Sequence, residues 1–260
     1  MKLIYQNESL SAKSLYAAKE FKLFDIRIDN LTIDAAVTNI IAPRRSAQAK
    51  TVCFVNVNSF NLAHHDASLK HAINAADYVF ADGSGARIAA QRKGYRLLDN
   101  VNGTDLLPKL CERAIQENKS IYLLGAKPEV AEKAANKLVQ QYPGLRIAGS
   151  HHGYFDKNNC SDVINKINQS QADILLVAFG SPIQENFLQT HKASLSVNTV
   201  VAVGGLFDFY SGNISRAPLW MRELGLEWIW RLIQEPKAKF NRYVIGNPIF
   251  LYRCFFKNLI

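Results

Sequence analysis

SIYLLGAKPEVAEKAANKLVQQYPGLRIAGSH, residues 120–151, is the stretch that best indicates how this chain folds. It begins with the apolar segment SIYLLGA and ends with RIAGSH, both short and rich in residues typical of β-strands. Between them, Val130, Ala134, Leu138 and Val139 recur at the spacing of one helical face. The stretch therefore predicts a strand, a helix and a second strand.

The same alternation extends along most of the chain. Further apolar, β-rich segments begin at Thr51, Tyr78, Ala172 and Thr199, and longer segments with helical patterns separate them. FDIRIDNLTIDAAVTNII, residues 24–41, predicts one more strand and helix. Strands that alternate with helices favour an α/β fold, in which a mostly parallel sheet has helices on both faces.

Length and composition indicate a globular chain with a basic end. Its 260 residues are 48% hydrophobic, which is enough to bury one large core or two small ones. Residues 213–260 hold five Arg and three Lys against three Glu, so +5 of the formal net charge of +9 lies there, together with all three Trp. We therefore expect an α/β core over residues 1–212 and an appendage over residues 213–260. The charge favours an anionic partner, which could be nucleic acid, an acidic membrane or a phosphate-bearing substrate.

Cysteine spacing and hydropathy indicate where the chain resides. Cys53, Cys111, Cys160 and Cys254 form no C-x-x-C pair, which indicates neither a zinc site nor a disulfide framework and favours a reducing, cytoplasmic compartment. Residues 1–21 contain no apolar run long enough for the core of a signal peptide, and no segment reaches the roughly 18 apolar residues that span a bilayer. Contact with a membrane is therefore expected only from its surface.

An acidic residue stands where one of the predicted strands ends. In DYVFADGSGARIAA, residues 77–90, Asp82 follows the strand and precedes Gly83, Gly85 and a helical pattern. Ligands of open α/β sheets bind at the carboxyl ends of the strands, and the glycines would let the backbone turn and leave room beside the carboxylate. Alternatively, Asp82 only caps the following helix, because Asp is a preferred N-cap residue.

Two other predicted strands end in similar loops. LLGAKPEV places Gly125 before a helix, and VAFGSPIQEN leads into Gln184 and Glu185. Free backbone N–H groups and the positive end of a helix dipole suit a diphosphate at such loops, although Ser and Pro are also ordinary capping residues. Neither G-x-x-x-x-G-K-[ST] nor G-x-G-x-x-G follows a strand, which argues against kinases and nicotinamide-dependent oxidoreductases.

Adjacent histidines give little support for a metal site. His64 and His65, like His151 and His152, are neighbours in sequence, and neighbouring side chains point away from each other on a helix or strand. We expect surface or supporting roles for all four. The alternative is that His151 or His152 lines a pocket, because both follow a strand.

The basic, aromatic end of the chain has the composition of an interfacial segment. In APLWMRELGLEWIWRLIQEP, residues 217–236, a single apolar helix would place Glu223, Glu227 and Arg231 at i, i+4 and i+8 and would need a partner. Further on, cations interleave with aromatic rings, which suits lipid phosphates and headgroups. Packing on the core and binding of single-stranded nucleic acid are the alternatives; we favour a membrane over nucleic acid because the last segment is strongly apolar. The cations are Lys237, Lys239, Arg242, Arg253 and Lys257.

Several separated blocks of the sequence resemble one family of bacterial glycosyltransferases. They include INAADYVFADGSGA, NGTDLLPKL, ILLVAFGSPIQENF, VAVGGLFDFYSGNISRAP and GLEWIWRLIQEP, and the matching blocks extend in order from about Thr51 to Tyr243. The combination of GSPxQE, DFxxGxxxRAP and LEWxxRLxxEP is specific. On these motifs the chain resembles the WecG/TagA/CpsF family.

The resemblance implies a Rossmann-like α/β fold whose C-terminal appendage touches the membrane. It also implies an inverting reaction, without metal or cofactor, that moves a sugar from a UDP-sugar to a polyprenyl-diphosphate-linked sugar at the inner face of the cytoplasmic membrane, for cell-surface polysaccharide. A single displacement needs one base for the acceptor hydroxyl and cations or N–H groups for the leaving diphosphate. By motif, Asp82 matches the proposed general base. The residues that we assign to substrate binding are Asn56, Asn100, Gly103, Thr104, Asp105, Gly125, Gln184, Glu185, Gly205, Asp208, Arg216, Arg231 and Arg242.

The sequence departs from the family pattern at several positions. Asn100 stands where many members carry an arginine, Phe54 replaces a threonine, and Ala238 and Asn241 stand where arginines are common. The loss of a pocket arginine removes a charge that could pair with a carboxylate. We therefore expect a neutral hexose or N-acetylhexosamine as donor sugar, such as N-acetylmannosamine or glucose, rather than N-acetylmannosaminuronic acid.

The altered pocket leaves other hypotheses open. One is a binding or regulatory module that retains the fold and holds nucleotide-sugar or nucleic acid without catalysis. A nicotinamide-dependent oxidoreductase is disfavoured by the missing glycine motif. An apolar tail can pack on a second copy of the chain as readily as on lipid, so a homo-oligomer is a further alternative.

Overall fold

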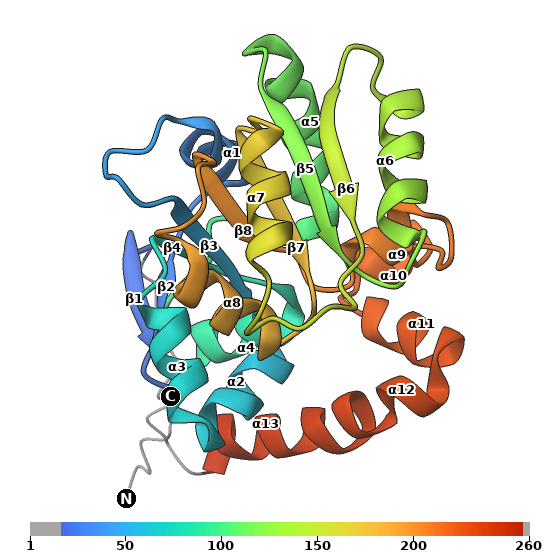
Figure 1. Ribbon diagram of the computed structural model, residues 1–260. Helices are drawn as coiled ribbons and strands as arrows, with labels where there is room; N and C mark the ends of the chain where they lie inside the picture. The colour runs from blue at the N-terminus through green and yellow to red at the C-terminus, as the bar shows by residue number, and fades with distance from the viewer. Residues whose placement is uncertain (1–16, 257–260) are drawn as a thin grey trace, which may run out of the picture.

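The computed structural model describes residues 17–256 and is built around one parallel sheet (Figure 1). Within those residues, six strands pair in the order β4-β3-β8-β7-β5-β6, and each neighbouring pair is parallel. Most of residues 1–21, for which the sequence predicted no signal peptide, and the cation Lys257 lie outside the described residues. The strands are β3 (Lys50–Val55), β4 (Tyr78–Ala81), β5 (Ser120–Gly125), β6 (Arg146–His151), β7 (Ile174–Ala178) and β8 (Thr199–Ala202).

A hairpin and a helix precede the sheet. β1 (Glu20–Leu23) pairs antiparallel with β2 (Ile26–Asp29), and α1 (Ile33–Ile41) follows. Asp29 Oδ2 accepts a hydrogen bond from the backbone N–H of Val79 on β4 at 2.7 Å, which attaches the hairpin to the edge of the main sheet. The strand and helix predicted near the N-terminal end are confirmed.

Alternating side chains along the strands fill two separate cores, one on each face of the sheet. On β3, Cys53 and Val55 belong to one core, and Val52 and Phe54 belong to the other. The predicted α/β class, with a Rossmann-like parallel sheet and helices on both faces, is therefore confirmed. The first face is covered by α2 (Val57–His65), α3 (Ala67–Asn74), α4 (Gly83–Arg92), α7 (Ser161–Gln169) and α8 (Ile183–His191). The second is covered by α1, α5 (Gly103–Gln116), α6 (Val130–Gln141) and α9 (Leu206–Tyr210).

The helix between β5 and β6 corrects one detail of the sequence analysis. Of the four apolar residues predicted to share a face of α6, Val130, Ala134 and Leu138 are buried, whereas Val139 is 43% exposed. One residue advances a helix by about 100°, so Val139 lies beyond the edge of the buried stripe.

Residues 213–256, named the appendage below, form a row of short helices beneath the carboxyl ends of the strands. In Figure 1, α11, α12 and α13 run along the lower edge of the molecule, on the side toward which the arrows of β3 and β5 point. The segments are α10 (Leu219–Glu223), α11 (Glu227–Gln234), α12 (Pro236–Phe240), the π-helical turn η1 (Asn241–Ile245) and α13 (Gly246–Phe256).

The single helix predicted for residues 217–236 is wrong, because the chain breaks at Gly225. This residue has a φ of +72°, in the left-handed region that favours glycine, and it separates α10 from α11. Ser84 Oγ of α4 donates a hydrogen bond to the Gly225 carbonyl at 3.1 Å. A Cβ atom at Gly225 would lie 2.8 Å from Ser84 Cβ, so the break lets the appendage approach α4 closely.

The last helix packs on the core through one face. Phe250 and Cys254 are buried, and the Phe250 ring lies 5.3 Å from that of Phe24 and 5.8 Å from that of Phe60. The guanidinium of Arg253 donates to Asn61 Oδ1 on α2 at 3.0 Å. Core packing, one of the alternatives from the sequence, therefore applies to this face of α13.

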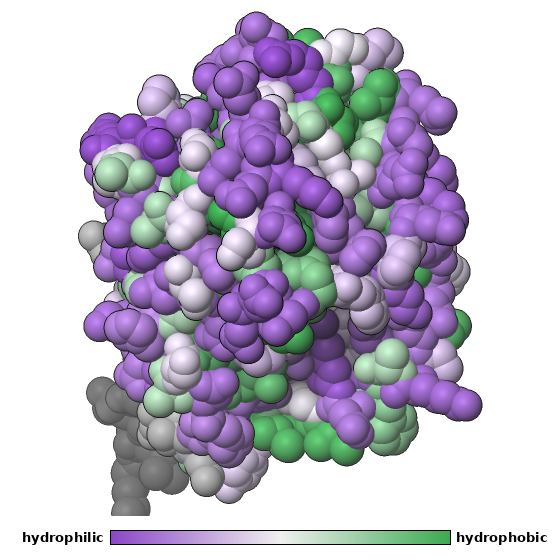
Figure 2. Space-filling view, in the orientation of Figure 1, coloured by the Kyte–Doolittle hydropathy of each residue, from purple (hydrophilic) through white to green (hydrophobic). Residues whose placement is uncertain are grey.

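The outward side of the appendage carries exposed apolar side chains. Figure 2 shows them as a hydrophobic strip along the lower edge of the molecule. Within residues 17–256, no helix combines the length and the apolar character that crossing a membrane requires. The exposed large apolar residues of α12, η1 and α13 are Phe240, Val244, Ile245, Ile249, Leu251, Tyr252, Phe255 and Phe256.

Candidate active site

A large cleft separates the carboxyl ends of the strands from the appendage. Its volume is about 1580 Å³, and it is lined by the loops that follow β3 to β8 and by residues of α10 to α13. Figure 2 shows a hydrophilic hollow at this level, above the hydrophobic strip. Open α/β sheets bind ligands at this edge. Ligand pockets of about 300–1,000 Å³ hold one drug-sized molecule, so this cleft has room for two substrates.

Asp82 lines the cleft at the end of β4. It occupies the N-cap position of α4, but its side chain makes no capping hydrogen bond. Its carboxylate instead accepts a hydrogen bond from Asn56 Nδ2 at 3.2 Å. The alternative from the sequence, that Asp82 only caps the helix, is therefore wrong, and the carboxylate is available to a ligand.

Asn56 orients this carboxylate from the end of β3. Its Oδ1 accepts from the backbone N–H groups of Asn58 at 3.1 Å and Ser59 at 3.3 Å, which caps the N-terminus of α2. Because the oxygen of the amide is used in the cap, its NH₂ group faces Asp82. Capping of α2 by the Asn56 oxygen therefore sets the direction of the Asn56 NH₂ group, which donates to the Asp82 carboxylate.

The surroundings of Asp82 raise its pKa above the usual value for aspartate. Burial is the main cause, and the hydrogen bond from Asn56 and the positive charge of Arg242 offset part of the rise. The nearby carboxylates of Glu227 and Asp105 add to it. A carboxylate with a raised pKa binds a proton more strongly, which suits a general base that works near neutral pH.

Gln184 and Glu185 brace the loops that follow β7 and β8. Gln184 Oε1 accepts from the backbone N–H groups of Gly180 at 3.2 Å and Gly204 at 3.0 Å, which joins the loops after β7 and β8. Glu185 is buried next to Gln184. Its Oε1 accepts from Gln184 Nε2 at 2.9 Å and from Ser181 Oγ at 2.6 Å. Burial raises the pKa of Glu185, and these two donors only partly offset the rise.

Arg231 is the most buried cation of the appendage that lines the cleft. It is 7% exposed, its Nε lies 2.6 Å from Glu235 Oε2, and its Nη2 lies 3.5 Å from Asp208 Oδ2. Its guanidinium also lies over the Phe209 ring at 4.7 Å. The i, i+4 spacing of Glu227 and Arg231 would also suit a helical ion pair, but Glu227 pairs with Arg216.

Three guanidinium groups at the cleft carry buried N–H donors that have no hydrogen-bond partner among residues 17–256. They are Nη1 of Arg231, Nε of Arg242 and Nε of Arg222. A buried donor without a partner costs free energy, about 1–3 kcal/mol or more for a charged group. An anion in the cleft would satisfy such donors, and a diphosphate matches the planar fork of arginine.

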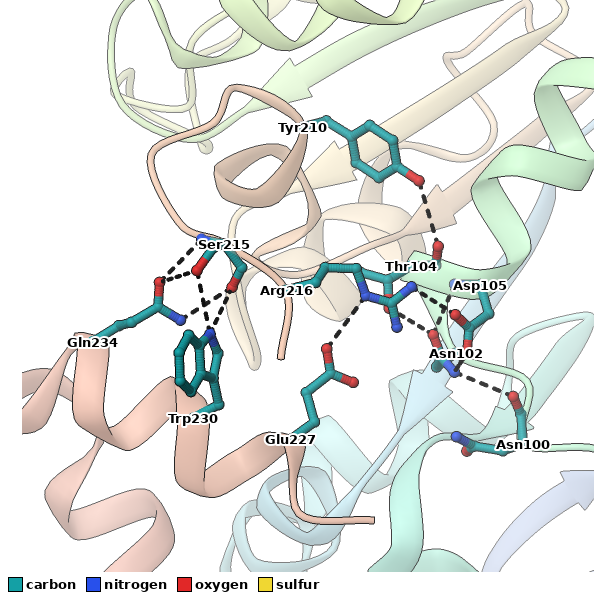
Figure 3. A network of polar contacts seen from close by, with 10 residues as sticks. All are labelled: Asn100, Asn102, Thr104, Asp105, Tyr210, Ser215, Arg216, Glu227, Trp230 and Gln234. Atoms are coloured by element: carbon teal, nitrogen blue, oxygen red, sulfur yellow. Dashed lines mark hydrogen bonds and ion pairs between the residues drawn. The ribbon is translucent and has the colours of Figure 1, made fainter. Parts of the chain in front are cut away.

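A polar network joins the appendage to the core beside the cleft (Figure 3). Arg216 Nη1 donates to Asp105 Oδ1 at 2.7 Å, and Arg216 Nε donates to Glu227 Oε1 at 3.4 Å. Burial alone would raise the pKa of Asp105, but hydrogen bonds from Asn102 and Arg216 outweigh it and lower the pKa below its usual value. Arg216 is therefore held between two carboxylates.

Comparison with known sequences decides the family. Residues 21–260 match the sequence profile described as "Glycosyl transferase WecG/TagA/CpsF family". The chain belongs to this family. A protein of Staphylococcus aureus (strain MW2), named N-acetylglucosaminyldiphosphoundecaprenol N-acetyl-beta-D-mannosaminyltransferase, is 30% identical over 237 residues, which cover 89% of this chain and 90% of the relative. The resemblance inferred from the sequence blocks is confirmed.

The cleft of this WecG/TagA/CpsF family member brings together most of the residues that its motifs single out. Gly125 has a different role, because its φ is +137° and a Cβ atom there would lie 2.4 Å from the carbonyl oxygen of Ala178. The predicted residues that line the cleft are Asn56, Asp82, Asn100, Gly103, Thr104, Gln184, Gly205, Asp208, Arg231 and Arg242. Those that do not line it are Asp105, Gly125, Glu185 and Arg216.

His151 and His152 border a small separate cavity and not the cleft, which agrees with the surface or supporting roles expected for them. Another pair of residues was missed from the sequence. Arg222 and Glu227 line the cleft and were not predicted to do so. The sequence pattern places both on one continuous helix; the signal that could have separated them is Gly225, an isolated glycine between two helical patterns.

Substitution of Asn56 by Asp tests how the family's candidate base is held. The new carboxylate would still cap α2, but it would bring a second negative charge to the place where a donor lies 3.2 Å from Asp82 now. A like charge at this distance raises the pKa of Asp82 further. We expect the acid limb of the pH profile of kcat/KM to move to higher pH, so that activity is lost first at low pH.

The control is Asn56→Ser, which keeps a good capping oxygen and adds no charge. It should shift the acid limb less than Asn56→Asp does. Equal shifts in the two variants would contradict the electrostatic account.

Proposed function

We propose that this chain is an inverting, metal-independent glycosyltransferase that uses a UDP-sugar and a polyprenyl-diphosphate-linked sugar in the synthesis of a cell-surface polysaccharide. Among neutral hexoses and N-acetylhexosamines, N-acetylmannosamine is the best supported donor sugar, because the staphylococcal relative is named for its transfer to N-acetylglucosaminyldiphosphoundecaprenol. One observation carries the proposal. The Asp82 carboxylate makes no helix-capping hydrogen bond, and it lines the same cleft as the buried guanidinium N–H donors that have no hydrogen-bond partner among the described residues.

In the proposed reaction, Asp82 accepts the proton of the acceptor hydroxyl as its oxygen attacks the anomeric carbon of the donor. The bond between that carbon and the diphosphate oxygen breaks on the opposite face, and UDP departs with the bonding electrons. One displacement inverts the anomeric configuration. The raised pKa of Asp82 supports this role, because proton transfer is most efficient when the pKa of the base is near the working pH.

Cations of the appendage would stabilise the departing diphosphate. Its negative charge grows as the bond breaks, and guanidinium groups held in a partly closed site stabilise such charge without reorganising. The unpaired donors of Arg222, Arg231 and Arg242 are the groups that we assign to this role.

The charges of the cleft support a neutral donor sugar. Asn100 offers no cation, and its Oδ1 already accepts from the backbone N–H of Gly83 at 2.6 Å. The carboxylates of Asp82, Asp208 and Glu227 also line the cleft. A uronic acid would add another carboxylate among these acids, which like-charge repulsion opposes.

Acceptor-dependent release of UDP tests the proposed function. The full chain is incubated with UDP-N-acetylmannosamine, UDP-N-acetylglucosamine or UDP-glucose, with and without a short-chain polyprenyl-diphosphate-linked N-acetylglucosamine. We expect rapid UDP release only with UDP-N-acetylmannosamine and acceptor together. Binding of UDP-sugars without turnover would instead support the non-catalytic module.

We also propose that the appendage holds the protein at the inner face of the cytoplasmic membrane. Exposed apolar side chains and the cations of the same segment support this placement, because rings settle at the headgroup level while each Lys or Arg near an anionic surface contributes about 1 kcal/mol. A second copy of the chain would be the competing occupant of the same surface. Sedimentation without lipid separates the two alternatives.

Vesicle binding provides the quantitative prediction for this surface. The double variant Phe255→Asp/Phe256→Asp should bind phosphatidylglycerol vesicles at least about tenfold more weakly, because two exposed rings are lost and negative charge is added. Val139→Asp is the control, since Val139 is exposed on α6, outside the appendage. If the double variant bound vesicles as tightly as the wild type does, the C-terminal end of α13 would not be part of the membrane contact.

A further inference from the structure

A continuous set of polar contacts leads from the appendage to the backbone beside Asp82. Figure 3 shows its part from Glu227 to Asn100. It begins at Glu227 on α11, which Arg216 joins to Asp105 at the start of α5. Arg216 belongs to the connection between α9 and α10, so one guanidinium links a carboxylate of the appendage to a carboxylate of the core. Neither Arg216 nor Asp105 lines the cleft.

From Asp105 the contacts continue through Asn102. Asn102 Nδ2 donates to Asp105 Oδ2 at 2.6 Å and to the Asn100 carbonyl at 3.3 Å. Its Oδ1 accepts from Thr104 Oγ1 at 2.7 Å and from the Asp105 backbone N–H at 2.9 Å, which caps α5. Both ends of this amide are therefore engaged, and the Asn100 carbonyl also accepts from the Asn102 backbone N–H at 3.0 Å, so Asn102 holds the backbone of Asn100 through two donors.

The last link is the hydrogen bond from the backbone N–H of Gly83 to Asn100 Oδ1 at 2.6 Å. Gly83 follows Asp82 directly and has a φ of +89°, so the peptide between them is held in a turn that few other residues adopt. Asp82 itself donates its N–H to the Val55 carbonyl at 2.8 Å. Release of the Gly83 peptide would let the Asp82 carboxylate rotate onto the free N–H groups of α4 as an ordinary N-cap.

We propose that Asn100 and Arg216 are positioning residues that make the orientation of Asp82 depend on docking of the appendage. When α11 is docked, Glu227 and Asp105 hold the Arg216 guanidinium. Asn102 then holds Asn100, whose Oδ1 keeps the Asp82–Gly83 peptide in its present orientation. Asn100 is then an element of this coupling and not a ligand of the sugar. The inference deepens the proposed function, and only its turnover test depends on that function.

Hydrogen exchange of the Gly83 amide in the full chain tests the coupling without any substrate. We expect Arg216→Gln and Glu227→Gln to speed Gly83 exchange at least about tenfold, although Gly83 bonds to neither residue. Asn100→Ala, which removes the direct partner, should have at least the same effect. Arg113→Gln is the control, because Arg113 lies on α5 and forms an ion pair with Glu117. Near-ultraviolet circular dichroism verifies that each variant is folded.

The result that would overturn the proposal is wild-type exchange of Gly83 in both Arg216→Gln and Glu227→Gln. Glu227→Gln keeps the half-buried Arg216 and its partner Asp105. It therefore gives a result even where Arg216→Gln destabilises the chain. Acceleration in these two variants but not in Arg113→Gln supports the coupling.

A double-mutant cycle on turnover gives the second readout. Arg216→Gln and Asn100→Ala should each lower kcat about tenfold with little change in the KM for the UDP-sugar, and the double variant should be no worse than the slower single variant. A hundredfold loss in the double variant would mean that the residues act independently. If the wild-type chain transfers no sugar, the proposed function fails, while the exchange experiment still decides the coupling.

Discussion

Asp82→Asn is expected to lower kcat at least about a hundredfold while the KM for the UDP-sugar stays nearly unchanged. Asparagine has the shape of aspartate and can occupy the same place beside Asn56, but it cannot accept the proton of the acceptor hydroxyl. Rates of acceptor-dependent UDP release, measured at saturating acceptor, give both constants. Near-normal turnover in this variant would show that Asp82 is not the base.

The same substitution should leave the thermal unfolding temperature unchanged or higher. The pKa of Asp82 is raised in the folded chain, so above that pKa the ionised carboxylate is less favourable in the folded chain than in the unfolded chain. A neutral side chain removes this cost at neutral pH. Loss of turnover without loss of stability is the combination expected of a buried catalytic base. Asp34→Asn, which changes an exposed carboxylate paired with Lys109, is the control and should alter neither quantity.

The parallel sheet could be predicted from the sequence because its strands are buried on both faces. Such strands appear as continuous apolar runs, and β5 and β7 are buried along their whole lengths. β1 was not predicted, because its sequence EFKL alternates exposed and buried residues over only four positions. Its identity as a strand depends on pairing with β2 in a hairpin outside the main sheet.

The position of the candidate base was predictable, but several contacts around it were not. A parallel sheet places all strand ends on one edge, so Asp82 had to lie near the ligand site. The partners of Gln184 could not be predicted, because Gly180 and Gly204 follow two different strands. Only the packed structure brings those loops within reach of one amide oxygen.

Sequence spacing also failed to select the partner of Arg231. Glu227 and Glu235 lie four residues before and after it, and both spacings suit a helical ion pair. The break at Gly225 makes Glu227 the first residue of α11, where it pairs with Arg216. Glu235 and Asp208 are left to hold Arg231 at the cleft.

Substitution of Arg231 is expected to have the second large effect, on affinity for the diphosphate. A hydrogen bond to a charged group contributes about 1.5–3 kcal/mol, so Arg231→Gln should weaken UDP binding by about 10- to 150-fold. Arg231→Lys keeps the charge but loses the planar fork, and it should weaken UDP binding by an intermediate amount. Isothermal titration calorimetry with UDP measures both. Arg113→Gln, on an exposed ion pair of α5, is the control.

Uridine distinguishes a phosphate contact from a structural role. Arg231 is buried against Asp208 and Glu235, so its removal leaves Asp208 without this cation and Glu235 with Lys239 at 3.7 Å, and it also lowers stability. A distorted cleft would weaken the binding of uridine and of UDP alike, because both carry the same nucleoside. Loss of a phosphate contact would weaken the binding of UDP only. We expect uridine affinity to stay within about twofold of wild type in Arg231→Lys, since a direct phosphate contact is absent from that ligand. Equal losses for the two ligands would place Arg231 in the scaffold of the cleft and leave the diphosphate to Arg222 and Arg242.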